Sequence, residues 1–195
     1  TSLQKEVGVE DIVDAMEEND VLFFGEEHND SVTHFLENKI FETLFSRYGK
    51  QVTLSLEMFD RDVQTVMNEY LDGYIREKNF KKDARVWSNY ADYRPMIEFA
   101  KTNNVDVICA NAPSRYTNLA GRKGQEALRE LSMEAKNHFA PLPYDTASDG
   151  YYEKLMGLSS HDPSPSKDTA AKKAPLPAMA MGGFNLIVAQ SLWDA

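Results

Sequence analysis

The chain has 195 residues, 42% of them apolar, and its 21 basic and 31 acidic side chains give a formal net charge of −10. This length and apolar fraction can build one globular core, which excludes a disordered acidic tail. The acidic balance excludes a nucleic-acid backbone binder, because such a protein needs a basic face. The acidity is local, since residues 1–30 hold ten acidic residues and one basic residue.

The single cysteine, Cys109, lies in an apolar, strand-like run. One cysteine cannot form an internal disulfide or build a zinc or iron–sulfur site by itself, so we expect a buried, inert thiol. The longest uncharged run, residues 174–193, contains Pro, Gly, Asn and Gln. A bilayer-spanning helix rarely combines these residues, so we predict no transmembrane segment.

Apolar side chains recur along the first part of the chain with alternating helical and strand periodicity. Residues 7–18 have helical spacing, residues 21–24 form a compact apolar run, and Asn29-Asp30-Ser31 is typical of a helix start. Further apolar runs predict strands at residues 52–56 and 105–110, with helices at 62–71, 78–82 and 94–101.

This alternation predicts an α/β fold with a parallel-core sheet, in which the three strands are neighbours and helices flank them. Beyond Pro113 the pattern turns helical, which predicts a helical second half. We expect one α/β domain over residues 1–158 and a flexible, Pro/Ser/Lys-rich linker over residues 159–174. Residues 175–195 are expected to form a helical segment that packs on the same domain, and the chain looks truncated because it stops in mid-pattern.

Polar residues follow each predicted strand. They are Glu26, Glu27 and His28 after the first, Glu57 after the second and Asn111 after the third. Since ligands of open parallel sheets bind outside the carboxyl ends of the strands, we expect these residues to line one crevice. Buried carboxylates need compensation, so we expect Arg61 or Arg94 to lie close to them.

Two interpretations of this strand-end cluster remain open. A neutral His28 with neighbouring carboxylates can bind a metal ion or act as a base. Alternatively, the acids form salt bridges with Arg61 or Arg94 and His28 caps a turn. His34 is expected on a helix, facing solvent. No HExxH, CxxC, GxGxxG, P-loop or GxSxG motif occurs, so we assign no catalytic residue and no metal ligand.

Six segments in chain order carry a more specific signal. They are residues 25–30 (GEEHND), 56–64 (LEMFDRDVQ), 87–95 (WSNYADYRP), 110–116 (ANAPSRY), 140–144 (APLPY) and 189–195 (AQSLWDA). Together they resemble the ChaN-like haem-binding uptake family of the Tiki superfamily. Members of that family usually continue well past the last of these segments.

The resemblance implies haem binding in iron or haem handling, a tyrosine as axial ligand, and a homodimer that forms with haem. Phenolate is a suitable ligand for ferric haem. The candidate tyrosines within matched segments are Tyr93, Tyr116 and Tyr144. The candidate partners of the propionates are Arg115, Arg122 and Lys123, and we expect the groove in the helical half after Pro113.

The resemblance also leaves two alternatives. Some superfamily members are thought to be metal-dependent hydrolases, in which the positions of His28 and Glu57 would be functional. The chain could instead be an accessory or scaffold subunit that binds partner proteins in a larger assembly. The resemblance implies a bacterial cell envelope or, for a plant or algal protein, a plastid. We favour a haem-binding protein over an enzyme.

Overall fold

The computed structural model describes residues 6–144 and the backbone of residues 184–189. The chain divides into two compact units, Thr1–Asn111 with Gly183–Ala195, and Ala112–Gly182. The sequence pattern predicted one domain through residue 158, whereas the division falls at Ala112. The predicted linker, residues 159–174, lies outside the described residues.

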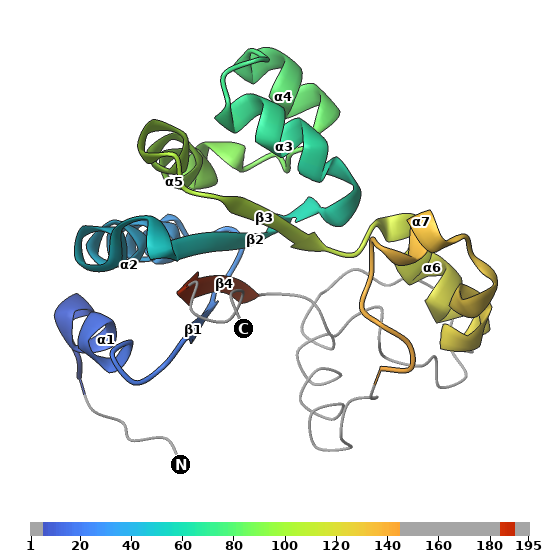
Figure 1. The fold of residues 1–195 in the computed structure, drawn as a ribbon, viewed down its shortest axis with the longest axis horizontal. Helices are drawn as coiled ribbons and strands as arrows, with labels where there is room; N and C mark the ends of the chain where they lie inside the picture. The colour runs from blue at the N-terminus through green and yellow to red at the C-terminus, as the bar shows by residue number, and fades with distance from the viewer. Residues whose placement is uncertain (1–5, 145–183, 190–195) are drawn as a thin grey trace. The chain divides into compact units, whose positions relative to one another are not determined.

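The first unit contains a four-stranded sheet in the order β1-β4-β2-β3 (Figure 1). Its strands are β1 (Val21–Gly25), β2 (Val52–Asp60), β3 (Val107–Asn111) and β4 (Phe184–Ala189). Strands β2 and β3 are parallel, with Leu54 opposite Val107. Strand β4 is antiparallel to both β1 and β2, so β1, β2 and β3 run in the same direction.

The α/β fold and the shared sheet of the three predicted strands are confirmed, but two details of the prediction are wrong. Strand β4 lies between β1 and β2, which are therefore not neighbours. Residues 184–189, expected within a helical segment, form this strand. A short apolar run such as FNLIVA suits a buried strand or a buried helix equally well, and here strand pairing on both sides decides the outcome.

The helices of the first unit are α1 (Val9–Ala15), α2 (Ser31–Tyr48), α3 (Gln64–Leu71), α4 (Glu77–Asp83) and α5 (Tyr90–Asn103). Asp30 is the N-cap of helix α2, and its carboxylate accepts hydrogen bonds from the Val32 amide at 2.9 Å and the Thr33 hydroxyl at 2.6 Å. The first of these bonds satisfies a free amide of the first turn. Helix α2 packs against α1 and α5, and α3 packs against α4, α5 and β3 (Figure 1).

The described part of the second unit is helical, as the sequence predicted. It contains α6 (Ser114–Lys123), the 3-10 helix Gln125–Glu130 and α7 (Met133–Lys136). Gly124 ends α6 with a φ of +78°, a conformation that favours glycine. Among the described helices of both units, none has the length and apolar character needed to cross a membrane.

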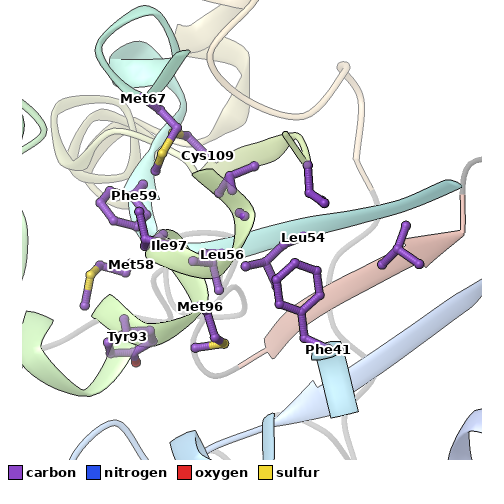
Figure 2. Close-up of a cluster of buried hydrophobic side chains, with 14 of the residues drawn as sticks. Phe41, Leu54, Leu56, Met58, Phe59, Met67, Tyr93, Met96, Ile97 and Cys109 are labelled. Atoms are coloured by element: carbon purple, nitrogen blue, oxygen red, sulfur yellow. The ribbon is translucent and has the colours of Figure 1, made fainter. Parts of the chain in front are cut away.

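The core of the first unit forms around β2, which is buried from Val52 to Phe59. Figure 2 shows the cluster that surrounds it. It includes Phe41, Leu54, Leu56, Phe59, Met96 and Ile97. Cys109 is buried within it as a free thiol, as expected, and this burial raises its pKa to about 12. A near-continuous buried run is typical of a central strand that is covered on both faces.

Replacing Phe41, which is fully buried, tests this core. We expect Phe41→Ala to lower the free energy of unfolding by about 3–5 kcal/mol, because it leaves a cavity in addition to the lost apolar burial. The matched control is Phe23→Ala, since Phe23 is 67% exposed. Urea unfolding followed by circular dichroism measures both. Equal losses in the two variants would contradict the described packing.

Candidate functional site

The carboxylate of Glu26 is the centre of a buried polar cluster at the end of β1. Its side chain is 1% exposed. Oxygen Oε1 accepts a hydrogen bond from the Tyr93 hydroxyl and lies 3.1 Å from His28 Nδ1. Oxygen Oε2 lies 2.9 Å from His34 Nδ1. One carboxylate therefore joins the loop after β1 to α2 and α5.

His34 is held in a defined orientation from its other side. It is 1% exposed, and its Nε2 lies 3.1 Å from the backbone carbonyl oxygen of His28. Since a carbonyl can only accept, Nε2 carries the hydrogen and donates it. The Asn89 side-chain amide donates to the same carbonyl. In a neutral His34, Nδ1 therefore presents a lone pair toward Glu26.

Glu37 adds a second carboxylate one helical turn beyond His34. Both residues lie on α2, where side chains three positions apart are neighbours. Glu37 is fully buried, and its Oε2 lies 3.8 Å from His34 Nδ1. One ligand atom from each of Glu26, His34 and Glu37 lies within 4.8 Å of the others. We call these three residues the α2 cluster.

Tyr93 keeps its proton in this environment. Burial raises the pKa of its phenol, and the hydrogen bond to Glu26 raises it further. The negative charges of Glu26, Glu37 and Glu57 act in the same direction. The phenol is therefore a hydrogen-bond donor that orients Glu26.

The predicted strand-end residues are only partly brought together. Glu26 and His28 are in contact, and the charge of Glu57 acts on the same Tyr93 phenol. Glu57 lies inside β2, because that strand continues to Asp60. Glu27 is exposed, and Asn111 lies at the end of β3 opposite Asp60.

The contacts of Glu26 include neither Arg61 nor Arg94, the two arginines expected to lie close to the strand-end carboxylates. Arg94 donates to Glu77 at 2.6 and 3.2 Å and lies 3.8 Å from Glu98. Arg61 donates to the side chain of Gln64 at 2.9 Å. The His28 imidazole and the Tyr93 phenol engage one oxygen of Glu26 in place of a guanidinium, since a buried carboxylate is also stabilised by neutral donors.

His34 and Glu37 were missed, and His34 was wrongly expected to face solvent. Both lie on the face of α2 that also buries Phe41 and Leu44. The spacing 34, 37, 41, 44 is that of a single helical stripe, so the sequence did carry a signal. Polar residues within an otherwise apolar stripe indicate a buried polar site.

The second unit has a groove of different character. Its cavity, about 360 Å³ in volume, is lined by Arg129, Lys136, Phe139, Ala140, Pro141 and Leu142. The Phe139 ring lies 5.2 Å from that of Tyr116, and the Arg115 guanidinium lies 4.4 Å over the Tyr116 ring. We call the six lining residues the unit-two groove.

The other candidates in this unit have local contacts. Tyr144 exchanges hydrogen bonds with Gln125 through its backbone, and burial raises the pKa of its phenol. Arg122 donates to Asn118 at 2.8 Å. Arg122 and Lys123 are both exposed in the last turn of α6.

Comparison with known proteins gives the class of this chain. A family model described as "Haem-binding uptake, Tiki superfamily, ChaN" matches residues 12–195. The chain therefore belongs to this family, as the six sequence segments indicated.

Two individual proteins are similar over part of their length. A solved structure of Campylobacter jejuni, "Cofacial heme binding to ChaN", matches with a TM-score of 0.60 and 16% identity, over 80% of this chain and 59% of that chain. The chloroplastic protein RETICULATA-RELATED 5 of Arabidopsis thaliana is 24% identical over 94 residues, 47% of this chain and 12% of that protein. The chain thus matches about an eighth of this curated relative, and the structural likeness shows a shared fold.

Removing the Tyr93 hydroxyl tests the cluster around Glu26. We expect Tyr93→Phe to lower the free energy of unfolding by about 1–3 kcal/mol, because a buried carboxylate loses a donor. Tyr74→Phe is the matched control, since Tyr74 is 80% exposed. Urea unfolding at neutral pH measures both variants, and a Tyr93→Phe protein as stable as the control would refute the described hydrogen bond.

Proposed function

We propose that this chain binds haem at the unit-two groove. The observation that carries the proposal is the pairing of an apolar wall, Phe139 and Leu142, with two cationic side chains, Arg129 and Lys136. Haem has a large flat apolar face and two anionic propionates, so it needs both features in one place. Membership of the haem-binding uptake family supports the same function.

The distribution of charge also supports the second unit as the haem site. Its described residues, 112–144, include five basic and three acidic side chains. Residues 6–111 of the first unit include 22 acidic and 11 basic side chains. The basic charge of the second unit attracts a dianionic ligand, and the acidic charge of the first unit repels it.

Among the three candidate tyrosines, Tyr116 fits the role of axial ligand best. Tyr93 is fully buried and donates its hydroxyl hydrogen to Glu26, and its raised pKa disfavours the phenolate that ligates ferric haem. Burial raises the pKa of the Tyr144 phenol, which disfavours a phenolate there. Tyr116 is only partly buried and packs against Phe139 of the groove. Bound haem would supply a ferric iron, for which phenolate is a suitable ligand.

The basic residues of the second unit differ in their position relative to the unit-two groove. Arg129 and Lys136 line the groove and are the proposed partners of the propionates. Arg115 lies over the Tyr116 ring, where it positions the proposed ligand. Arg122 and Lys123 are the weaker candidates, because they lie in the exposed last turn of α6. A homodimer that forms with haem remains part of the proposal.

An accessory function in a plastid assembly is a second candidate. The similarity to a chloroplastic protein over 47% of this chain favours it. In this alternative the chain has the same fold and binds partner proteins, but it does not bind haem. The haem titration below separates the two candidates.

Titration of the protein with haemin tests the proposal. We expect a saturable Soret change with a high-spin ferric spectrum in the wild type, and at least about tenfold weaker binding for Tyr116→Phe, since an axial ligand is lost. Tyr74→Phe is the matched control for an exposed phenol, and His28→Ala should bind haem as the wild type does.

Each possible result of the haemin titration points to a different function or a different axial ligand. Absence of a saturable Soret change in the wild type rejects haem binding and leaves the accessory function. Loss of binding in Tyr144→Phe, with Tyr116→Phe unaffected, retains haem binding and reassigns the ligand. Arg129→Gln and Lys136→Gln should each weaken binding without changing the spin state, because they contact the propionates only.

A further inference from the structure

We propose that the α2 cluster, Glu26, His34 and Glu37, binds a divalent transition-metal ion of the class of Zn²⁺ or Mn²⁺. This site lies in the first unit and does not depend on the proposed haem groove. Its ligand atoms would be His34 Nδ1, Glu26 Oε2 and one carboxylate oxygen of Glu37. Two carboxylates and one imidazole form a set that divalent zinc, manganese and iron accept, whereas monovalent copper prefers sulfur ligands.

The first observation is a buried pair of acceptor atoms that face each other. Glu26 Oε2 and His34 Nδ1 are 2.9 Å apart, and both side chains are 1% exposed. Neither atom makes a hydrogen bond. In the neutral imidazole that donates from Nε2, Nδ1 has a lone pair that can be given to a metal ion. A cation bound to both atoms would supply the partner that each of them lacks.

The spacing of the three residues suits one metal ion. Zinc binds nitrogen and oxygen ligands at about 2.0–2.2 Å, which places neighbouring ligand atoms about 3.0–3.4 Å apart in octahedral or tetrahedral geometry. The observed separations from His34 Nδ1 are 2.9 Å to Glu26 and 3.8 Å to Glu37. All three ligand atoms lie within 4.8 Å of one another, so a side-chain rotation that brings the Glu37 carboxylate closer would complete the set.

The second observation is that both Glu26 and His34 are oriented from outside the cluster. His34 Nε2 donates to the His28 backbone carbonyl, the arrangement that metal-bound histidines almost always show. The Tyr93 hydroxyl and His28 Nδ1 engage the other oxygen of Glu26. These contacts leave His34 Nδ1 and Glu26 Oε2 close together and without a hydrogen bond. His28 and Tyr93 are therefore positioning residues.

Charge favours the same conclusion. The cluster brings the carboxylates of Glu26 and Glu37 next to one buried imidazole. Buried charges are stable when they are paired or when they coordinate a metal. A divalent ion balances both carboxylates and leaves His34 neutral. Three protein ligands are the number found in zinc sites that keep a position open for water.

Metal binding to haem-free protein tests the proposal. After treatment with a chelator, the wild type should bind one equivalent of Zn²⁺ in a calorimetric titration, and zinc should raise its melting temperature. We expect Glu37→Gln and His34→Gln to bind zinc at least about a hundredfold more weakly, because each loses a ligand. His28→Ala should weaken binding by about tenfold, as positioning residues do.

The controls separate this site from surface binding. Glu42→Gln alters a carboxylate on the same helix that accepts from Asn38, and His138→Gln removes a histidine of the second unit. Both should bind zinc as the wild type does. If either ligand variant is unfolded by circular dichroism, Glu26→Gln replaces it, and the visible spectrum of bound Co²⁺ reports the ligand set. No zinc binding by the wild type, or equal binding by all variants, overturns the proposal.

Discussion

Burying the Glu26 carboxylate sets a condition that several elements must meet at once. A carboxylate removed from water needs hydrogen-bond donors or positive charge close to it. Here Tyr93 and His28 contact one oxygen of Glu26, and the other oxygen lies 2.9 Å from His34 Nδ1, where we propose that a cation binds. The end of β1, the first turns of α2 and the first turn of α5 therefore have to come together for the unit to fold.

This condition explains why polar residues occur on faces that otherwise build the core. His34 and Glu37 continue the stripe of Phe41 and Leu44 on α2, and Tyr93 precedes Met96 and Ile97 on α5. Figure 2 shows Tyr93 beside Met96 and Met58 in the apolar cluster. The apolar side chains of each helix pack in the core. The polar side chains of the same faces lie around Glu26 at the end of β1.

The features of the fold that could be predicted from the sequence are those that depend on local residue patterns. The run Val52–Leu56 identified β2 as a strand, and the alternation of such runs with helical stripes identified the α/β fold. These patterns could not predict that β4 enters between β1 and β2, because more than 120 residues separate β4 from its nearer partner β2. Pairing over such distances depends on the whole sheet.

The site was predicted in part for the same reason. Glu26 and His28 follow a strand directly, so topology alone placed them. The partner of Arg94 could not be predicted, since Glu77 on α4 and Glu98 on its own helix α5 are both carboxylates within reach. His34 was misplaced because a histidine in a helix was taken as solvated, although its spacing from Phe41 puts it on the buried face.

The two units offer ligands opposite kinds of surroundings. The first presents buried carboxylates and imidazoles, which attract cations, and the second presents a basic groove with an apolar wall, which suits a flat anion. The chain belongs to a family named for haem binding, and haem is an anion. Its strand-end residues, in contrast, favour a cation. We infer two separate sites in one chain.

An anomalous difference map of crystals of the zinc-loaded protein, measured at the zinc absorption edge, would locate the metal ion itself. We expect one strong peak in the first unit, bonded to His34 Nδ1, Glu26 Oε2 and an oxygen of Glu37, with His28 and Tyr93 still in contact with the other oxygen of Glu26. A map with no peak among these residues, and zinc only at exposed histidines, would contradict this expectation.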